Sequence, residues 1–321
     1  MRPELSAQRT HRRWVAVVPW LLALLAPQPS ASIQIALLAL GVAFLGLPHG
    51  ALDHRVARPL LANRWGSGWL PLFLVAYLAV AALVLAAWWW IPALTLVGFL
   101  LLSIVHFGAD AAGDTGGSLH SMALHGGLPV VFPCAFHSQE VAALFGALVP
   151  GARWAEEVAR IGWIGAVLWC LLFAVAALRR EQPLGDLWML AGLALMFWRL
   201  PPLLAFAVYF CGVHSIHHLL EVVREEAPAG EEGLNWLLRE ALPLTTLTLL
   251  LVVSVAPAVS ADSTLTEGTV RMIFWVLAAL TVPHMGLLWV WNRARRQGLA
   301  DSVRTDRKAS FSGSSVPSQS R

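Results

Sequence analysis

The chain is dominated by long apolar stretches that are separated by short polar or Pro/Gly-rich connections. An α-helix needs about 20 apolar residues to cross the roughly 30 Å of hydrocarbon in a bilayer. The stretches span residues 14–26, 31–47, 69–90, 92–109, 119–148, 161–178, 186–198, 202–223, 240–258 and 269–292. Their length and lack of charge predict an all-α, polytopic transmembrane helix bundle of about 8–10 spans.

The first stretch, 14–26, allows two interpretations. A cluster of arginines precedes it and Pro27 follows it, which is also the pattern of a secretory signal cleaved near residues 30–32. The next stretch runs in the same direction in both cases. We expect three regions: an N-terminal arm with the first hydrophobic segment at 1–30, a membrane-embedded domain at 31–292, and a basic, Ser-rich disordered tail at 293–321.

Basic residues are distributed unevenly over the connections. With a cytoplasmic N-terminus, all 22 lysines and arginines fall on the cytoplasmic side except Arg153, Arg160, Arg199 and Arg271. This bias is what the positive-inside rule requires, and one span more or fewer would destroy it. We therefore expect a multi-pass protein of the cell (inner or plasma) membrane with both termini in the cytoplasm.

Composition narrows the possible functions. Hydrophobic residues make up 58% of the chain and charged residues only 13%, which excludes an ordinary soluble domain. The net charge of +3 sits in short connections and at the two ends, so it does not indicate nucleic-acid binding. The three cysteines lie in apolar stretches without CxxC spacing, which argues against a disulfide framework or a zinc knuckle.

Five histidines stand out because ionisable residues are costly within a membrane span and usually face the interior of the bundle. Their depth in the membrane follows from the helical rise of about 1.5 Å per residue. By this measure all five lie in the cytoplasmic half of the membrane, although they come from four separate stretches. They are His49, His106, His214, His218 and His284. Convergence on one metal ion is our preferred interpretation, and separate histidines bonded to neighbouring carbonyls are the alternative.

The densest histidine pattern runs from Tyr209 to Glu221. His214 and His218 are four residues apart and share one helix face, so both can bind one ion. His217 points about 60° aside from that line. Glu221 lies one turn further, where a carboxylate can accept an imidazole N–H and fix the ligating tautomer.

His49 is bracketed by a proline and a glycine, so we expect the helix to break there. Asp53 follows within one turn and has three possible roles: a carboxylate that supports an imidazole, a ligand, or the N-cap of the next helix. His54 stands beside Arg55 at the inner surface, where solvation is as good an explanation as function.

Other histidines carry weaker signals. His106 is a single imidazole in an apolar stretch. His284 follows a helix-kinking proline and could line the same cavity, and it ranks below His106 as a ligand. His125 and His137 accompany glycines and prolines in 119–148, which suggests a broken or re-entrant span that lines a cavity. The candidate metal ligands are His49, His106, His214 and His218. Candidates for a supporting or pocket-lining role are Asp53, His217, Glu221, His284, Tyr209 and His137.

Four imidazoles without a thiolate suit iron, copper, zinc or nickel, and chemistry on an apolar substrate favours a redox metal. We expect Fe(II). Four neutral imidazoles would leave up to two positions of the ion for O₂ and for a substrate.

Four motifs together resemble the Brp/Blh family of β-carotene 15,15′-dioxygenases, and the resemblance covers residues 33 to 292. The motifs are Gly46-Leu-Pro-His-Gly-Ala-Leu-Asp-His54, His106-Phe-Gly, Pro133-Cys-Ala-Phe-His137-Ser and His214-Ser-Ile-His-His218. The resemblance implies that the chain cleaves the central double bond of β-carotene with O₂ to two all-trans-retinal. It also implies an iron bound by His49, His106, His214 and His218, membrane lipid as surroundings, and a retinal-binding microbial rhodopsin as downstream partner.

Two other functions remain open at this point. The spacing His214-x-x-His217-His218 has the HxxHH form of membrane di-iron desaturases and hydroxylases, although those enzymes need about eight histidines in three such boxes. A non-enzymatic haem-binding or transport protein could also use intramembrane histidines as axial ligands.

Overall fold

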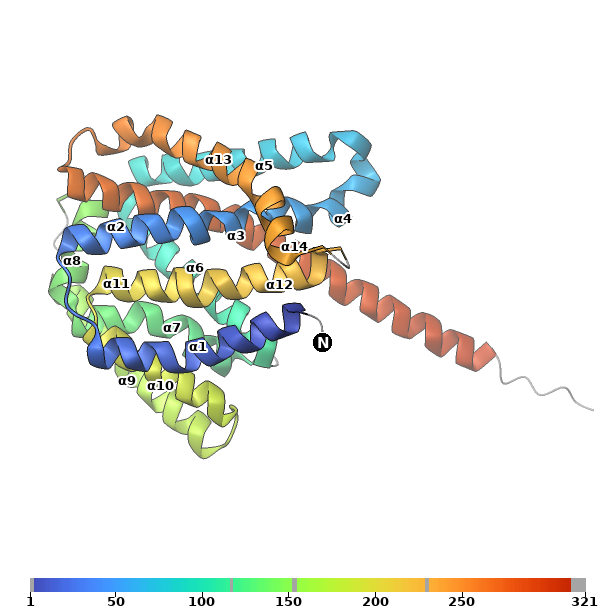
Figure 1. Ribbon diagram of the computed structural model, residues 1–321, viewed down its shortest axis with the longest axis horizontal. Coiled ribbons are helices and arrows are strands. Elements are labelled where there is room, and N and C mark those ends of the chain that lie inside the picture. Colours follow the sequence, from blue (N-terminus) through green and yellow to red (C-terminus); the bar gives the residue numbers. More distant parts are fainter. Residues whose placement is uncertain (1–2, 116–117, 152–154, 229–230, 313–321) are drawn as a thin grey trace, which may run out of the picture.

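A computed structural model of the chain describes residues 3–115, 118–151, 155–228 and 231–312. Within these ranges the chain is helical without a strand, which confirms the predicted all-α bundle (Figure 1). The first half contains α1 (Pro3–Leu25), α2 (Ala31–Gly41), the π-helix η1 (Val42–Gly46), α3 (Leu47–Ala51), α4 (Asp53–Trp65), the 3-10 helix η2 (Gly66–Gly68), α5 (Trp69–Trp90), α6 (Pro92–Thr115) and α7 (Leu119–Phe136). The second half contains α8 (Ser138–Leu148), α9 (Ala155–Leu178), α10 (Leu184–Arg199), α11 (Pro202–Ala207), the π-helix η3 (Val208–Ser215), α12 (Ile216–Glu226), α13 (Gly233–Ser260) and α14 (Leu265–Ser312).

Seven helical runs in the described residues are long and apolar enough to cross a membrane. The first, Ala31–Trp90, has 60 residues and contains two of the predicted stretches, which lie on either side of α4. Large apolar side chains on these runs, such as Leu83, Leu168 and Leu250, are exposed by more than half. Since exposed leucines in such number suit lipid better than water, the protein is a multi-pass membrane protein.

Two predicted stretches, 14–26 and 186–198, form α1 and α10 but are not among the seven runs. These helices pack against each other, with the Trp20 and Trp188 rings stacked at 4.4 Å. Gly192 permits this approach because a side chain there would meet the Trp20 ring nitrogen at 2.4 Å. The α1–α10 pair therefore forms one flank of the bundle.

The predicted helix break at His49 is wrong. The helix widens to the π-form in η1, before His49, and continues as the α-helix α3, which contains His49. The backbone bends only at Leu52, where ψ is −4°. Proline is tolerated here because Pro48 comes just after the π-helix η1, and such a local widening of the helix accommodates the missing N–H. The stretch 119–148 is broken as predicted, at His137 between α7 and α8.

In the structure α14 continues to Ser312 and projects beyond the bundle (Figure 1). The disorder of the tail at 293–321 stays a prediction. Residues 313–321 of the predicted tail lie outside the described residues.

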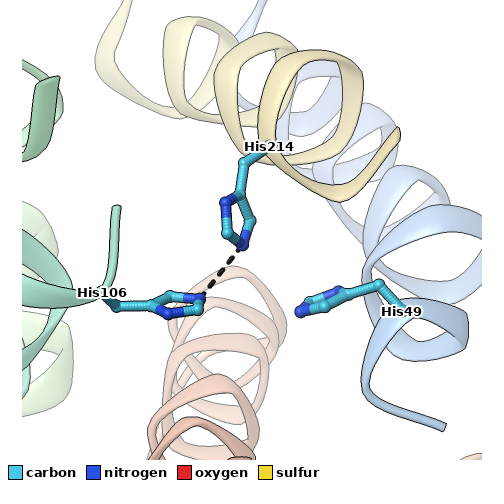
Figure 2. A group of neighbouring side chains, drawn as sticks. All are labelled: His49, His106 and His214. Carbon is cyan, nitrogen blue, oxygen red and sulfur yellow. Dashed lines mark hydrogen bonds between the residues drawn. The ribbon is translucent and has the colours of Figure 1, made fainter. Parts of the chain in front are cut away.

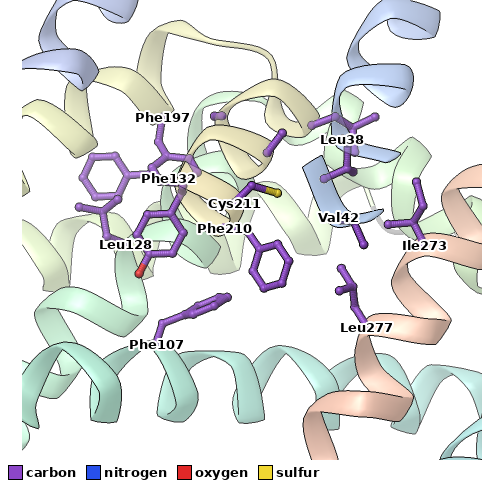
Figure 3. Packing of buried hydrophobic residues seen from close by; sticks show 14 of the residues in the cluster. Leu38, Val42, Phe107, Leu128, Phe132, Phe197, Phe210, Cys211, Ile273 and Leu277 are labelled. Carbon is purple, nitrogen blue, oxygen red and sulfur yellow. The ribbon is translucent and has the colours of Figure 1, made fainter. Parts of the chain in front are cut away.

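Close helix packing positions His106 on α6. Gly108 and Gly126 let α6 and α7 approach so closely that a side chain at Gly126 would overlap the Ile104 carbonyl oxygen. Small residues at helix interfaces are the usual way to bring membrane helices together. Next to this contact, Phe107 and Phe210 join the apolar core that α2, α6, α7, η3 and α14 build (Figure 3).

A candidate metal site of five histidines

Five buried histidines meet in the interior of the bundle, each at most 8% exposed. They come from five helical elements: His49 from α3, His106 from α6, His214 from η3, His218 from α12 and His284 from α14. The depth argument from the sequence predicted such a convergence.

Three of the four predicted ligands face one another directly (Figure 2). Ring nitrogens of His49, His106 and His214 all lie within 4.8 Å of one another. His106 Nε2 and His214 Nε2 are 3.1 Å apart, and the rings of His49 and His214 are 5.4 Å apart, nearly perpendicular. Such a set can bind a transition metal.

The fourth predicted ligand, His218, borders this trio. Its ring centroid lies 5.6 Å from that of His49. One of its nitrogens also lies within 4.8 Å of carboxylate oxygens of Asp110 and Glu221. Glu221 further contacts Arg224 at 3.6 Å, so it connects the cluster to the polar end of α12.

The outer nitrogens of His106 and His214 have partners of their own. His214 Nδ1 lies 3.0 Å from Asp110 Oδ2, and His106 Nδ1 lies 2.8 Å from the Met285 sulfur. A carboxylate or thioether only accepts, so each Nδ1 donates and each neutral ring keeps its lone pair on Nε2. Two lone pairs that face each other at 3.1 Å repel unless a proton or a cation lies between them. The pair therefore fits a metal ion.

Charge supports the same fit. The carboxylates of Asp53 and Asp110, whose side chains are 3% and 16% exposed, pair with the imidazoles of His284 and His214. Two negative charges in a low-dielectric interior need a positive counterpart, and a divalent ion supplies it.

Asp110 is the clearest residue that the sequence analysis missed. It lies four residues after His106 on α6, so the spacing rule that joined His214 to His218 would also have found it. Tyr77, Met285 and Ser215 were missed as well. Their contacts with Asp53, His106 and His49 join separate helices, and no local spacing indicates them.

Two further candidates point away from the cluster. The His217 ring lies against His11 of α1 at 6.3 Å, and His11 Nε2 donates to the Gly212 carbonyl 2.9 Å away. Burial lowers the pKa of His11, while the Gly212 carbonyl raises it. Tyr209 is buried with its ring 5.2 Å from that of Phe107 and 5.7 Å from that of Phe197, so it packs in the apolar core.

The remaining histidines have local roles in the helices. His137 Nε2 donates to the Trp198 carbonyl at 3.1 Å, which ties the α7–α8 junction to α10. His125 Nδ1 donates to the Ser121 carbonyl one turn earlier. His54 contacts the Ala51 carbonyl and lies 3.5 Å from Glu240.

An apolar cavity leads from the cluster to the outer face of the bundle. Its volume is about 90 Å³, and His49, His106 and His284 are among the residues that line it. Leu78 of α5 and Leu247 of α13 line it too, and these side chains are 43% and 42% exposed. A molecule dissolved in lipid could thus reach the histidines between α5 and α13.

Comparison with known proteins assigns a family. A family profile described as β-carotene 15,15′-dioxygenase matches residues 40–292. A protein from the uncultured marine bacterium 66A03, named β-carotene 15,15′-dioxygenase, is 29% identical over 256 residues, covering 77% of this chain and 90% of the relative. One from Halobacterium salinarum, named probable β-carotene 15,15′-dioxygenase Blh, is 26% identical over 329 residues, covering 90% and 95%. No solved structure matches.

The profile covers most of the chain and includes all five clustered histidines. Both relatives also align over most of their own length. The chain therefore belongs to the β-carotene 15,15′-dioxygenase family.

Proposed function

We propose that the chain is an iron-dependent oxygenase that cleaves β-carotene at its central 15,15′ double bond with O₂ and releases two all-trans-retinal. The observation that carries this proposal is the apolar cavity that ends on inward-facing imidazole nitrogens. The names of the two relatives supply the substrate and the bond.

In this proposal His49, His106, His214 and His218 bind Fe(II), which supplies the activation of O₂ when it is bound. Asp110 accepts the Nδ1 proton of His214 and so keeps its Nε2 lone pair directed inward. Phe210 and Leu277 line the cavity beside the histidines and exclude water from the reacting carbons.

The cavity receives the central part of the polyene beside the histidines, and its α5–α13 mouth admits the substrate from the membrane lipid. Residues 31–292 form the catalytic domain, and the protein lies in the cell (inner or plasma) membrane with both termini in the cytoplasm. A retinal-binding microbial rhodopsin is a downstream acceptor of the product.

Two observations support this function over the alternatives. A di-iron site of the HxxHH kind would recruit His217 together with His214 and His218, whereas the His217 ring faces His11. Haem ligation places single imidazoles on opposite faces of a flat ring, whereas three nitrogens here lie within 4.8 Å of one another. An iron content near one per chain and no Soret band are therefore expected.

Expression in a bacterial host that makes β-carotene tests the proposed function. We expect the orange colour to fade and retinal to appear in the extract when iron is supplied. His120→Ala is the matched control, because His120 contacts Glu181 and the Leu172 carbonyl away from the cluster, and this variant should bleach the cells as the parent does. Persistent colour with the protein present in the membrane would refute the proposal.

A further inference from the structure

His284 lies within the group of imidazoles and not behind it. Its ring centroid is 5.3 Å from that of His106, 5.5 Å from that of His49 and 5.5 Å from that of His218, and each pair of rings is nearly perpendicular. His284 thus meets three of the four ligands of the proposed iron site. A residue that merely supports one ligand would not be expected to contact three.

One nitrogen of His284 has a partner outside the cluster. Its Nδ1 lies 2.7 Å from Asp53 Oδ1, and both side chains are at most 4% exposed. The carboxylate accepts, so the Nδ1 carries the proton and the lone pair of the neutral ring remains on Nε2.

The other nitrogen, Nε2, is buried and has no hydrogen-bond partner in the described part of the chain. Buried polar atoms are almost always satisfied, so an unsatisfied lone pair needs an explanation. His284 also lines the cavity that His49 and His106 line. A metal ion among these rings would satisfy it.

Asp53 is itself held in place. Tyr77 Oη donates to Asp53 Oδ2 at 3.0 Å and lies 3.2 Å from the Leu280 carbonyl oxygen, one turn before His284 on α14. Tyr77, Asp53 and His284 therefore form a chain across α5, α4 and α14. On the other side of the cluster, Asp110 contacts His214 in the same way.

We propose that His284 is a fifth ligand of the metal, with Asp53 fixing its tautomer and ring direction. This inference rests on the metal site of the proposed function and adds to it. Metal-binding histidines commonly donate their second N–H to a carboxylate, and the two Asp–His pairs match this arrangement. A fifth imidazole would leave the metal fewer open positions than four do, so in this account the cavity, and not the metal, positions the polyene.

Metal binding by the purified full-length protein tests this inference without relying on turnover. We expect His284→Ala to weaken Fe(II) binding by more than about 100-fold, as for a ligand, and Asp53→Asn to weaken it by about 10–100-fold, as for a group that supports a ligand. The visible absorption of the Co(II)-loaded protein should change in His284→Ala and return when imidazole is added, because imidazole can occupy the space that the side chain leaves. A purely structural His284 would not give this recovery.

His125→Ala is the matched control, since His125 is another buried histidine and its Nδ1 is bonded to the Ser121 carbonyl of its own helix, so the metal affinity and spectrum of this variant should equal those of the parent. His284→Gln keeps most of the side-chain volume and serves as the second variant if alanine at this position prevents folding. Parental Fe(II) affinity and an unchanged Co(II) spectrum in a folded His284 variant would overturn the fifth ligand and leave the four-histidine site standing. Absence of metal binding in the parent chain would instead contradict the proposed function itself.

Discussion

Replacing His214 by alanine is expected to abolish carotenoid cleavage and to remove most of the bound iron. His214 has its Nε2 3.1 Å from that of His106 and its Nδ1 3.0 Å from Asp110, so it connects the ligand trio to a buried carboxylate. Loss of a group that only supports a ligand already lowers metal affinity or activity by about 10–100-fold, so loss of a ligand should exceed this. Iron per chain and retinal formed per minute, both measured on purified protein, check the prediction.

Alanine at His49, His106 or His218 should have the same outcome, because each belongs to the proposed ligand set. His120→Ala serves again as control and should retain iron and turnover. If folded His214→Ala protein kept its iron and its turnover, the metal would have to bind elsewhere.

Leu247→Trp is expected to reduce cleavage about tenfold or more without removing iron. Leu247 lines the cavity between the histidines and the lipid-facing surface, and an indole there would fill the path of a rigid polyene. Even small displacements of a substrate from the reactive geometry have large effects on rate. The measurement is the retinal formation rate and the iron content of the same sample.

Leu250→Trp is the matched control for this variant. Leu250 lies on the same helix, is 64% exposed and does not line the cavity, so its replacement should keep the parental rate. Equal rates for both variants would show that the substrate reaches the metal by another route.

The sequence predicts the helices and the gathering of the histidines well, because both depend on local patterns. Apolar runs give the spans, and a common depth follows from counting residues along them. The spacing of His214 and His218 is fixed by the helix itself. The metal-ligand role of these residues stays a prediction.

Contacts between helices are harder to predict from the sequence. The sequence ranked His284 below His106 as a candidate ligand, and nothing near it in the chain indicates that Asp53 reaches it from α4. His217 looked suited to support the site, yet α1 packs against that face and places His11 beside its ring. Such pairings depend on how helices distant in the sequence are packed.

The sequence also did not predict the local backbone conformation near the site. The π-helix η1 precedes His49, and the π-helix η3 contains His214. Each inserts an extra residue per turn, which rotates the side chains that follow. Proline and glycine next to His49 suggested a break, but the bend lies at Leu52.

The most direct test of the account is the product analysis of purified, iron-loaded protein incubated with β-carotene and O₂. We predict that retinal is the sole cleavage product, with two molecules formed for each β-carotene consumed, and that chelation of the iron stops the reaction. Unchanged β-carotene in the presence of bound iron, or aldehydes of unequal length from cleavage at another double bond, would contradict it.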